Sequence, residues 1–166
     1  MVGNSTAVNL KSWLDRFPMG LRQADADKNS GFKRACLLSG PPGIGKTTIA
    51  RAVGAMMGKE FRPLHATRAG VTELRKLADE ARIKPLLIFV DEVHRFSATQ
   101  ADDLLSICEN GTADFIGATT GNPYHVLPPA LVSRSTIFKL EPMTIEEMDL
   151  VVQRGLDHLR GTGLDI

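Results

Sequence analysis

One short segment of the sequence has residue types and spacing suited to binding phosphate. Gly40–Thr47 reads GPPGIGKT and fits GxxxxGK[ST] between an apolar run and a stretch with helical periodicity. Its glycines let backbone N–H groups point inward at phosphate oxygens, and the positive end of the following helix adds to them. That end carries only about half an elementary charge, so Lys46 and a metal ion must complete the neutralisation of a triphosphate. We expect Lys46 to reach the β- and γ-phosphates and the Thr47 hydroxyl to bind Mg²⁺. The alternative is a glycine-rich turn with a solvated lysine.

Two adjacent carboxylates follow the most hydrophobic run of the chain. Asp91 and Glu92 come directly after Leu86–Val90, which reads LLIFV and is typical of a buried strand. Carboxylates in such a place are costly unless a cation meets them. We expect Asp91 to hold the Mg²⁺ shell and Glu92 to polarise an attacking water. The alternative for Glu92 is to cap the next helix.

A second group of polar residues follows the predicted strand Phe115–Thr119. Thr119, Thr120 and Asn122 would lie near the γ-phosphate if this strand belongs to a parallel sheet. A hydroxyl or amide there can sense or orient the nucleophilic water. Thr-Thr-Gly-Asn-Pro is also an ordinary turn sequence, so composition leaves both interpretations open.

Arg134 precedes the last predicted strand, in Ser133–Ser135. An arginine delivered to the γ-phosphate of a neighbouring subunit contributes about 10³ to 10⁵ in rate. The alternative is a solvated charge in a loop.

The hydrophobic periodicity predicts an α/β fold in which short strands alternate with helices. The predicted strands are Ala35–Leu38, Phe61–Ala66, Leu86–Val90, Phe115–Thr119 and Thr136–Leu140. The predicted helices are Ala7–Phe17, a helix from the phosphate loop to Met57, Val71–Ala81, one opened by the capping box Ser97–Gln100 and ended by Asn110-Gly111, and one opened by Thr144 and Glu147. This order favours a five-stranded parallel sheet with helices on both faces and its ligand at the carboxyl ends of the strands. Pro63 predicts an edge position or a bulge for its strand.

Length and composition limit the remaining possibilities. The chain has 166 residues, 43% hydrophobic and 23% charged, with a net charge of +1. These values are typical of one globular domain and exclude a chain dominated by disorder. The balanced charge predicts no global attraction to nucleic acid or acidic membrane. No apolar run is long enough to cross a bilayer, and we expect a cytoplasmic or nuclear protein. Cys36 and Cys108 favour buried, reduced thiols.

Four segments between Gly40 and Leu140 together resemble a known family: GPPGIGKTT, IFVDEVHRF, DFIGATTGNP and ALVSRS. They resemble the AAA+ ATPases of the clamp-loader clade, in particular the replication-associated recombination protein A group (RarA, MgsA and the Werner-helicase-interacting ATPase). The resemblance implies a P-loop NTPase core at residues 1–142 and the first helix of an incomplete helical lid at 143–166. The start of the chain, from VNLKSWL to GFKRACLLSGPPGIGKTT, resembles instead the large subunit of replication factor C. The chain is then a divergent homologue, a fragment or a chimera of two relatives.

The resemblance also implies roles for single residues. Asp91 and Glu92 become the Walker B acids, Thr120 the first sensor with Thr119 as the alternative, and Arg134 an arginine finger acting in trans. His65 stands where relatives carry a small polar residue that holds the catalytic glutamate. The implied nucleotide contacts are the Walker A residues Pro42, Gly43, Ile44, Gly45, Lys46, Thr47 and Thr48, with Val2 and Gly3 against adenine.

Two functions follow from these patterns. The first is an ATP-binding and ATP-hydrolysing core of a DNA replication or repair ATPase, with Lys46, Thr120, Glu92 and Arg134 in catalysis, Thr47 and Asp91 on Mg²⁺, and an oligomer that shares Arg134 between subunits. The second is an interaction module that binds ATP or ADP with little turnover because its lid is incomplete. DNA and replication proteins are partners by resemblance only, and no membrane partner is expected.

Overall fold

The computed structural model describes residues 35–66, 70–109, 113–142, 144–146, 148–149, 152–153 and 156–157. Four predictions fall wholly or largely outside these residues: the helix at Ala7–Phe17, the adenine contacts Val2 and Gly3, the helix end at Asn110-Gly111, and most of the lid helix at 143–166. The division of the chain at 142 therefore stays a prediction.

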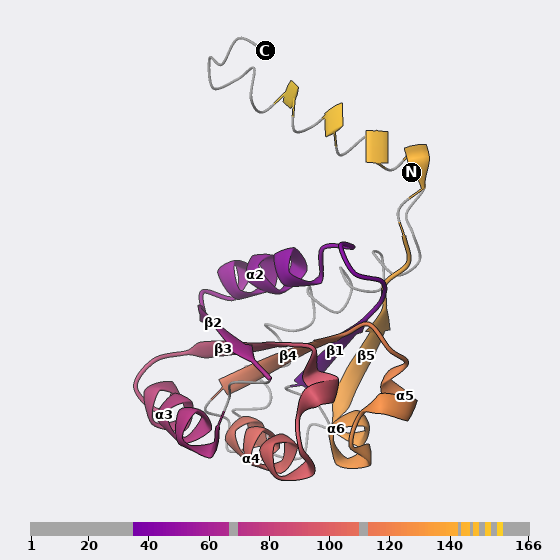
Figure 1. Cartoon of the computed structure of the whole chain (residues 1–166). Helices are drawn as coiled ribbons and strands as arrows, with labels where there is room; N and C mark the ends of the chain where they lie inside the picture. The colour runs from indigo at the N-terminus through magenta and orange to yellow at the C-terminus, as the bar shows by residue number, and fades with distance from the viewer. Residues whose placement is uncertain are drawn as a thin grey trace.

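Five strands form one parallel sheet in the order β2-β3-β4-β1-β5 (Figure 1). The strands are β1 (Ala35–Ser39), β2 (Glu60–His65), β3 (Leu86–Asp91), β4 (Ala113–Thr119) and β5 (Ser135–Lys139). The prediction of a five-stranded parallel sheet is confirmed. Strand β2 lies at an edge of the sheet, as Pro63 predicts. Proline has no N–H to donate, and an edge strand tolerates this because one of its sides has no partner strand.

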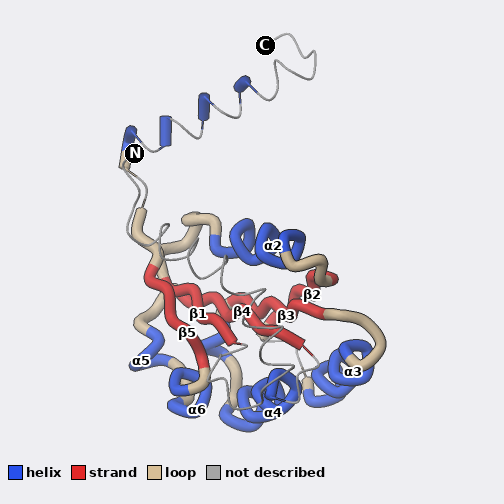
Figure 2. The backbone as a smooth tube through the Cα atoms, turned by 180° about the vertical axis from the view of Figure 1, so that it is seen from behind, coloured by secondary structure: helices blue, strands red, loops and turns tan. Residues whose placement is uncertain are grey.

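Helices cover both faces of the sheet, as predicted. Figures 1 and 2 show α2 on one face and α3, α4 and α6 on the other. The helices are α2 (Lys46–Met56), α3 (Val71–Ala81), α4 (Ala98–Glu109), α5 (Pro123–Val126) and α6 (Pro129–Ser133), with a 3₁₀ turn, η1, at Val93–Arg95. Elements η1, α5 and α6 were not predicted, because helices of three to five residues are too short to show a helical period.

The core has two apolar layers, one on each side of the sheet. Cys36 and Leu38 pack with Ala50 and Val53 of α2, whereas Leu37 faces the layer under α3, α4 and α6. Alternate residues of one strand point to opposite faces, so β1, β3 and β4 are buried on both sides. The sheet is thus a rigid support for the residues at the ends of its strands.

Local signals end and begin the helices as the sequence predicts. Gly58 has a φ of 62° directly after α2. Ser97 and Gln100 form the predicted capping box before α4. The Ser97 N–H donates to Gln100 Oε1 at 2.9 Å, and the Gln100 N–H donates to Ser97 Oγ at 3.2 Å.

The parallel register brings the carboxyl ends of the strands to one edge. Ser39 pairs with Thr119 and with Lys139, and His65 pairs with Asp91. The phosphate loop, the two acids and the polar segment after β4 therefore meet at this edge, as expected for a sheet of this class.

Two further findings concern the cysteines and membrane-spanning helices. Cys36 and Cys108 are both buried, as predicted, and burial raises the pKa of the Cys36 thiol. Of the helices in the described part of the chain, none combines the length and the apolar composition that a membrane span requires.

Candidate functional site

The loop between β1 and α2 has the curled backbone that the glycine pattern predicts. Gly43 and Gly45 have φ angles of 77° and 91°, values that a side chain disfavours. A Cβ at either position would meet nothing within 4 Å, so the backbone angle rather than space requires glycine there. Gly40 is required for lack of space, because a Cβ at this position would lie 2.6 Å from the Leu140 carbonyl oxygen. The loop ends at Gly45, whose carbonyl accepts from Ile49 N–H in the first turn of α2.

Lys46 is the first residue of α2, and its side chain folds back across the loop. Its ammonium donates to the carbonyl oxygens of Gly40 at 2.8 Å and Pro41 at 2.7 Å. The residue is only 8% exposed, which is rare for a lysine without a functional or paired role. Burial lowers the pKa of Lys46, and the negative charge of Asp91 opposes this shift. The charges of Lys46 and Asp91 are thus close enough to interact.

Thr47 and Asp91 offer the donor set expected for Mg²⁺. Both are exposed, Thr47 at the start of α2 and Asp91 at the end of β3. Within the described residues no cluster of three or more His, Cys, Asp or Glu forms a dedicated metal cage. Mg²⁺ binds through one or two protein oxygens together with phosphates and water, so this small set fits it.

Glu92 has an unusual backbone and a side-chain ion pair. It is the one non-glycine residue with positive φ, 51°, in the described ranges. Its N–H donates to Asp91 Oδ1 at 3.0 Å, and its Oε2 lies 2.7 Å from Arg95 Nε. Its side chain makes no capping bond to η1. Within the described residues, Glu92 is held by Arg95 of its own turn and not by His65 at the end of β2.

The polar residues after β4 have separate roles. Thr119 is 1% exposed, and its Oγ1 accepts from the Gly121 N–H at 3.2 Å and lies 3.1 Å from His94 Nδ1. Thr120 is exposed. Asn122 caps α5, because its Oδ1 accepts from the Tyr124 N–H at 3.2 Å. The turn interpretation therefore holds for Asn122, and the choice of a sensor between Thr119 and Thr120 stays a prediction.

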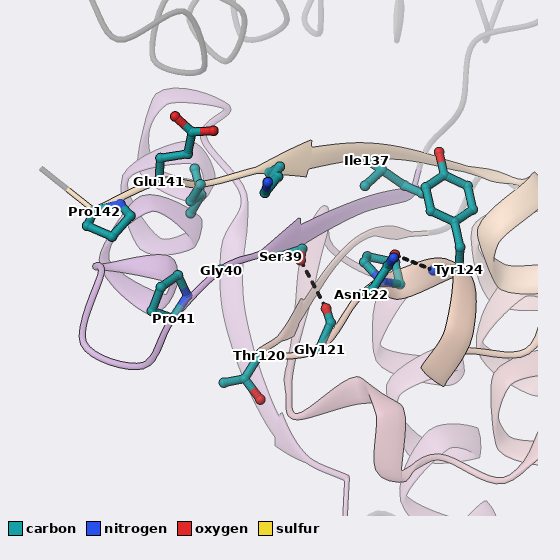
Figure 3. Close-up of a pocket in the computed structure, with 13 residues that line it drawn as sticks. Ser39, Gly40, Pro41, Thr120, Gly121, Asn122, Tyr124, Ile137, Glu141 and Pro142 are labelled. Carbon is teal, nitrogen blue, oxygen red and sulfur yellow. Dashed lines mark hydrogen bonds between the residues drawn. The ribbon is translucent and has the colours of Figure 1, made fainter.

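A cavity of about 810 Å³ lies beside the start of the phosphate loop (Figure 3). Gly40, Pro41 and Thr120 line it, which joins the phosphate loop to the end of β4. Ser39 Oγ donates to the Gly121 carbonyl at 3.0 Å and ties the two segments together. Asn122 also lines the cavity. The remaining lining residues were not selected from the sequence: Ser39, Gly121, Pro123, Tyr124, Ile137, Lys139, Leu140, Glu141 and Pro142. Their place at or near the carboxyl ends of β1, β4 and β5 is the one signal that could have indicated them.

Arg134 lies away from the other predicted site residues. It is the C-cap residue of α6 and lies in the turn before β5, and Ser135 after it pairs with Ala35, the first residue of β1. It is therefore at the amino edge of the sheet, opposite the phosphate loop. Its Nε lies 2.7 Å from Glu109 Oε1 at the end of α4. The geometry excludes a role for Arg134 at the site of its own subunit.

Comparisons with known proteins agree with this geometry. Residues 36–142 match the AAA family, described as the ATPase family associated with various cellular activities. This segment covers more than half of the chain and contains the loop, both acids and Arg134. The chain belongs to the AAA family.

Individual relatives point to one branch of that family. Replication-associated recombination protein A of Bacillus subtilis is 43% identical over 129 residues, which are 76% of this chain and 31% of that protein. Its Escherichia coli counterpart is 37% identical over 81% of this chain and 31% of its own length. ATPase WRNIP1 of Dictyostelium discoideum is 39% identical over 73% of this chain and 14% of its own. The chain spans less than a third of each relative.

Solved structures confirm the fold. The RuvB Holliday junction branch migration motor of Thermotoga maritima superimposes with a TM-score of 0.69 at 23% identity, covering 92% of this chain and 51% of that one. At this identity the likeness concerns the fold alone. The five-stranded sheet with its helices is that of AAA-type P-loop NTPases.

The buried hydrogen bonds of Thr119 generate a prediction for stability. Thr119→Val should lower the free energy of unfolding by about 1–3 kcal/mol, because it leaves the Gly121 N–H without its acceptor and His94 Nδ1 without its hydrogen-bond partner. Urea unfolding measures the change. Thr119→Ser keeps the hydroxyl and should lose at most about 1 kcal/mol for its methyl group. Equal stability of the valine variant and the unchanged protein would contradict these bonds.

Proposed function

We propose that this chain is the nucleotide-binding core of an AAA+ ATPase that converts ATP and water to ADP and phosphate. The observation that carries the proposal is the meeting of three features at one edge of the sheet. These are the curled loop with its buried Lys46, the strand-end Asp91, and the turn that presents Glu92.

The loop would bind the triphosphate through backbone amides. Pro42–Thr48 supplies the curled backbone and the amino end of α2, and both suit an anion. Lys46 would exchange its bonds to the Gly40 and Pro41 carbonyls for phosphate oxygens. The carbonyls hold its ammonium beside the loop beforehand, so little side-chain ordering remains to be done on binding.

Thr47 and Asp91 would hold Mg²⁺, which neutralises charge on the phosphates when it is bound. Glu92 would accept a proton from the attacking water. The water oxygen forms a bond to the γ-phosphorus, and the bond to the bridging oxygen of ADP breaks. Thr120, or Thr119 in its place, would orient that water from the end of β4.

Arg134 would act on the γ-phosphate of a neighbouring subunit. Its position at the amino edge supports a role in trans, because a neighbour's carboxyl edge can dock there whereas its own cannot. The name of one group of relatives, replication-associated recombination protein A, supports a wider proposal for the full-length protein: a part in recombination associated with replication. The net charge of +1 predicts weak DNA binding by this chain alone.

Glu92→Gln tests the hydrolytic step. Turnover should fall by about 10²- to 10⁴-fold with ATP binding retained, because the amide cannot accept the proton of the water. Phosphate release at high protein concentration measures the rate, and Glu73→Gln on α3 is the matched control. Tight ATP binding without phosphate release by the unchanged protein would favour the interaction module instead.

Mixing two inactive variants tests the shared finger. Lys46→Ala subunits and Arg134→Ala subunits should each be inactive, and an equal mixture should recover up to about a quarter of the normal rate. The reason is that half of the sites still bind ATP and half of those meet an intact Arg134. No recovery in assembled mixtures would rule out a finger in trans.

A further inference from the structure

The turn that carries Glu92 is fixed on several sides. Val93 is fully buried and Phe96 is 6% exposed, so both anchor η1 in the core. The Arg95 N–H donates to the Glu92 carbonyl at 2.9 Å, and His94 joins the turn to Thr119 of β4. The backbone around Glu92 therefore has little freedom.

The side chain of Glu92 gains its position from one cation. Arg95 Nε lies 2.7 Å from Glu92 Oε2, three residues along the same turn. Both side chains are about half exposed, so this pair contributes little to folding stability. The pair instead sets the orientation of the Glu92 carboxylate. The backbone of Glu92 has a φ of 51°, and the Arg95 guanidinium holds one of the two carboxylate oxygens.

We propose that Arg95 is a positioning residue for ATP hydrolysis, which orients the Glu92 carboxylate toward the attacking water. The inference rests on the proposed function. It assigns the orientation of the Glu92 carboxylate to a residue of the same turn. In the described residues His65, at the neighbouring end of β2, makes no hydrogen bond to Glu92. The shortest contact of the pair joins Arg95 Nε to Oε2, and Oε1 would accept the proton from water.

Steady-state kinetics of Arg95→Ala with Mg·ATP test the proposal. The kcat should fall by about 10- to 100-fold with KM unchanged, because misplacement of a base by about 1 Å slows the chemical step and not binding. Arg95→Lys keeps a cation and should restore part of the rate. Arg82→Ala is the matched control, since it removes a second i,i+3 pair, to Asp79, far from the site.

Combined variants separate the possible failures. In the Glu92→Gln background, Arg95→Ala should cause no further loss, because its effect passes through Glu92. An unchanged kcat, a raised KM with kcat unchanged, or an equal fall of kcat in both backgrounds would overturn the role of Arg95. Each of these results would leave the proposed function intact. Full turnover by Glu92→Gln alone would overturn both.

Discussion

The arrangement of this site depends on one interaction: the Lys46 ammonium donates hydrogen bonds to two backbone carbonyl oxygens. Gly40 and Pro41 accept its hydrogen bonds from within the loop that precedes Lys46. The bonds require a sharply curled backbone, which Gly43 and Gly45 allow by adopting positive φ. A cation is thereby placed beside backbone amides at a helix start, and this combination is suited to phosphate.

The parallel sheet supplies the carboxylate and hydroxyl groups that the loop lacks. Its register gathers Asp91, Thr119 and Ser39 at the edge where the loop begins. Contacts between neighbouring strand ends then hold these segments together, through His94 to Thr119 and through Ser39 to Gly121. The same register places Arg134 at the far edge, paired with Glu109. Under the proposed function, a sheet of this topology would separate the groups that act on a subunit's own nucleotide from the arginine that acts on a neighbour's.

The sequence predicted those parts of the fold that rest on local rules. Hydrophobic runs located the strands, the GxxxxGK[ST] pattern located the loop, and the Ser97–Gln100 pair located the start of α4. The ion pair of Arg95 with Glu92 and that of Arg134 with Glu109 could not be predicted. The first depends on the positive φ of Glu92, and the second joins two helices separated in the sequence. Asn122 stands in a segment whose composition left a sensor and an ordinary turn both open, and the structure shows it as the cap of α5.

Calorimetric titration of the folded protein with Mg·ATP tests most directly whether the loop binds a triphosphate. We expect saturable uptake of one nucleotide per chain, and binding weakened by about 10- to 100-fold in Lys46→Ala, which loses charge-assisted hydrogen bonds. Circular dichroism would show that both proteins are folded. Absence of uptake by the unchanged protein, or equal affinity of the Lys46→Ala variant, would contradict the account.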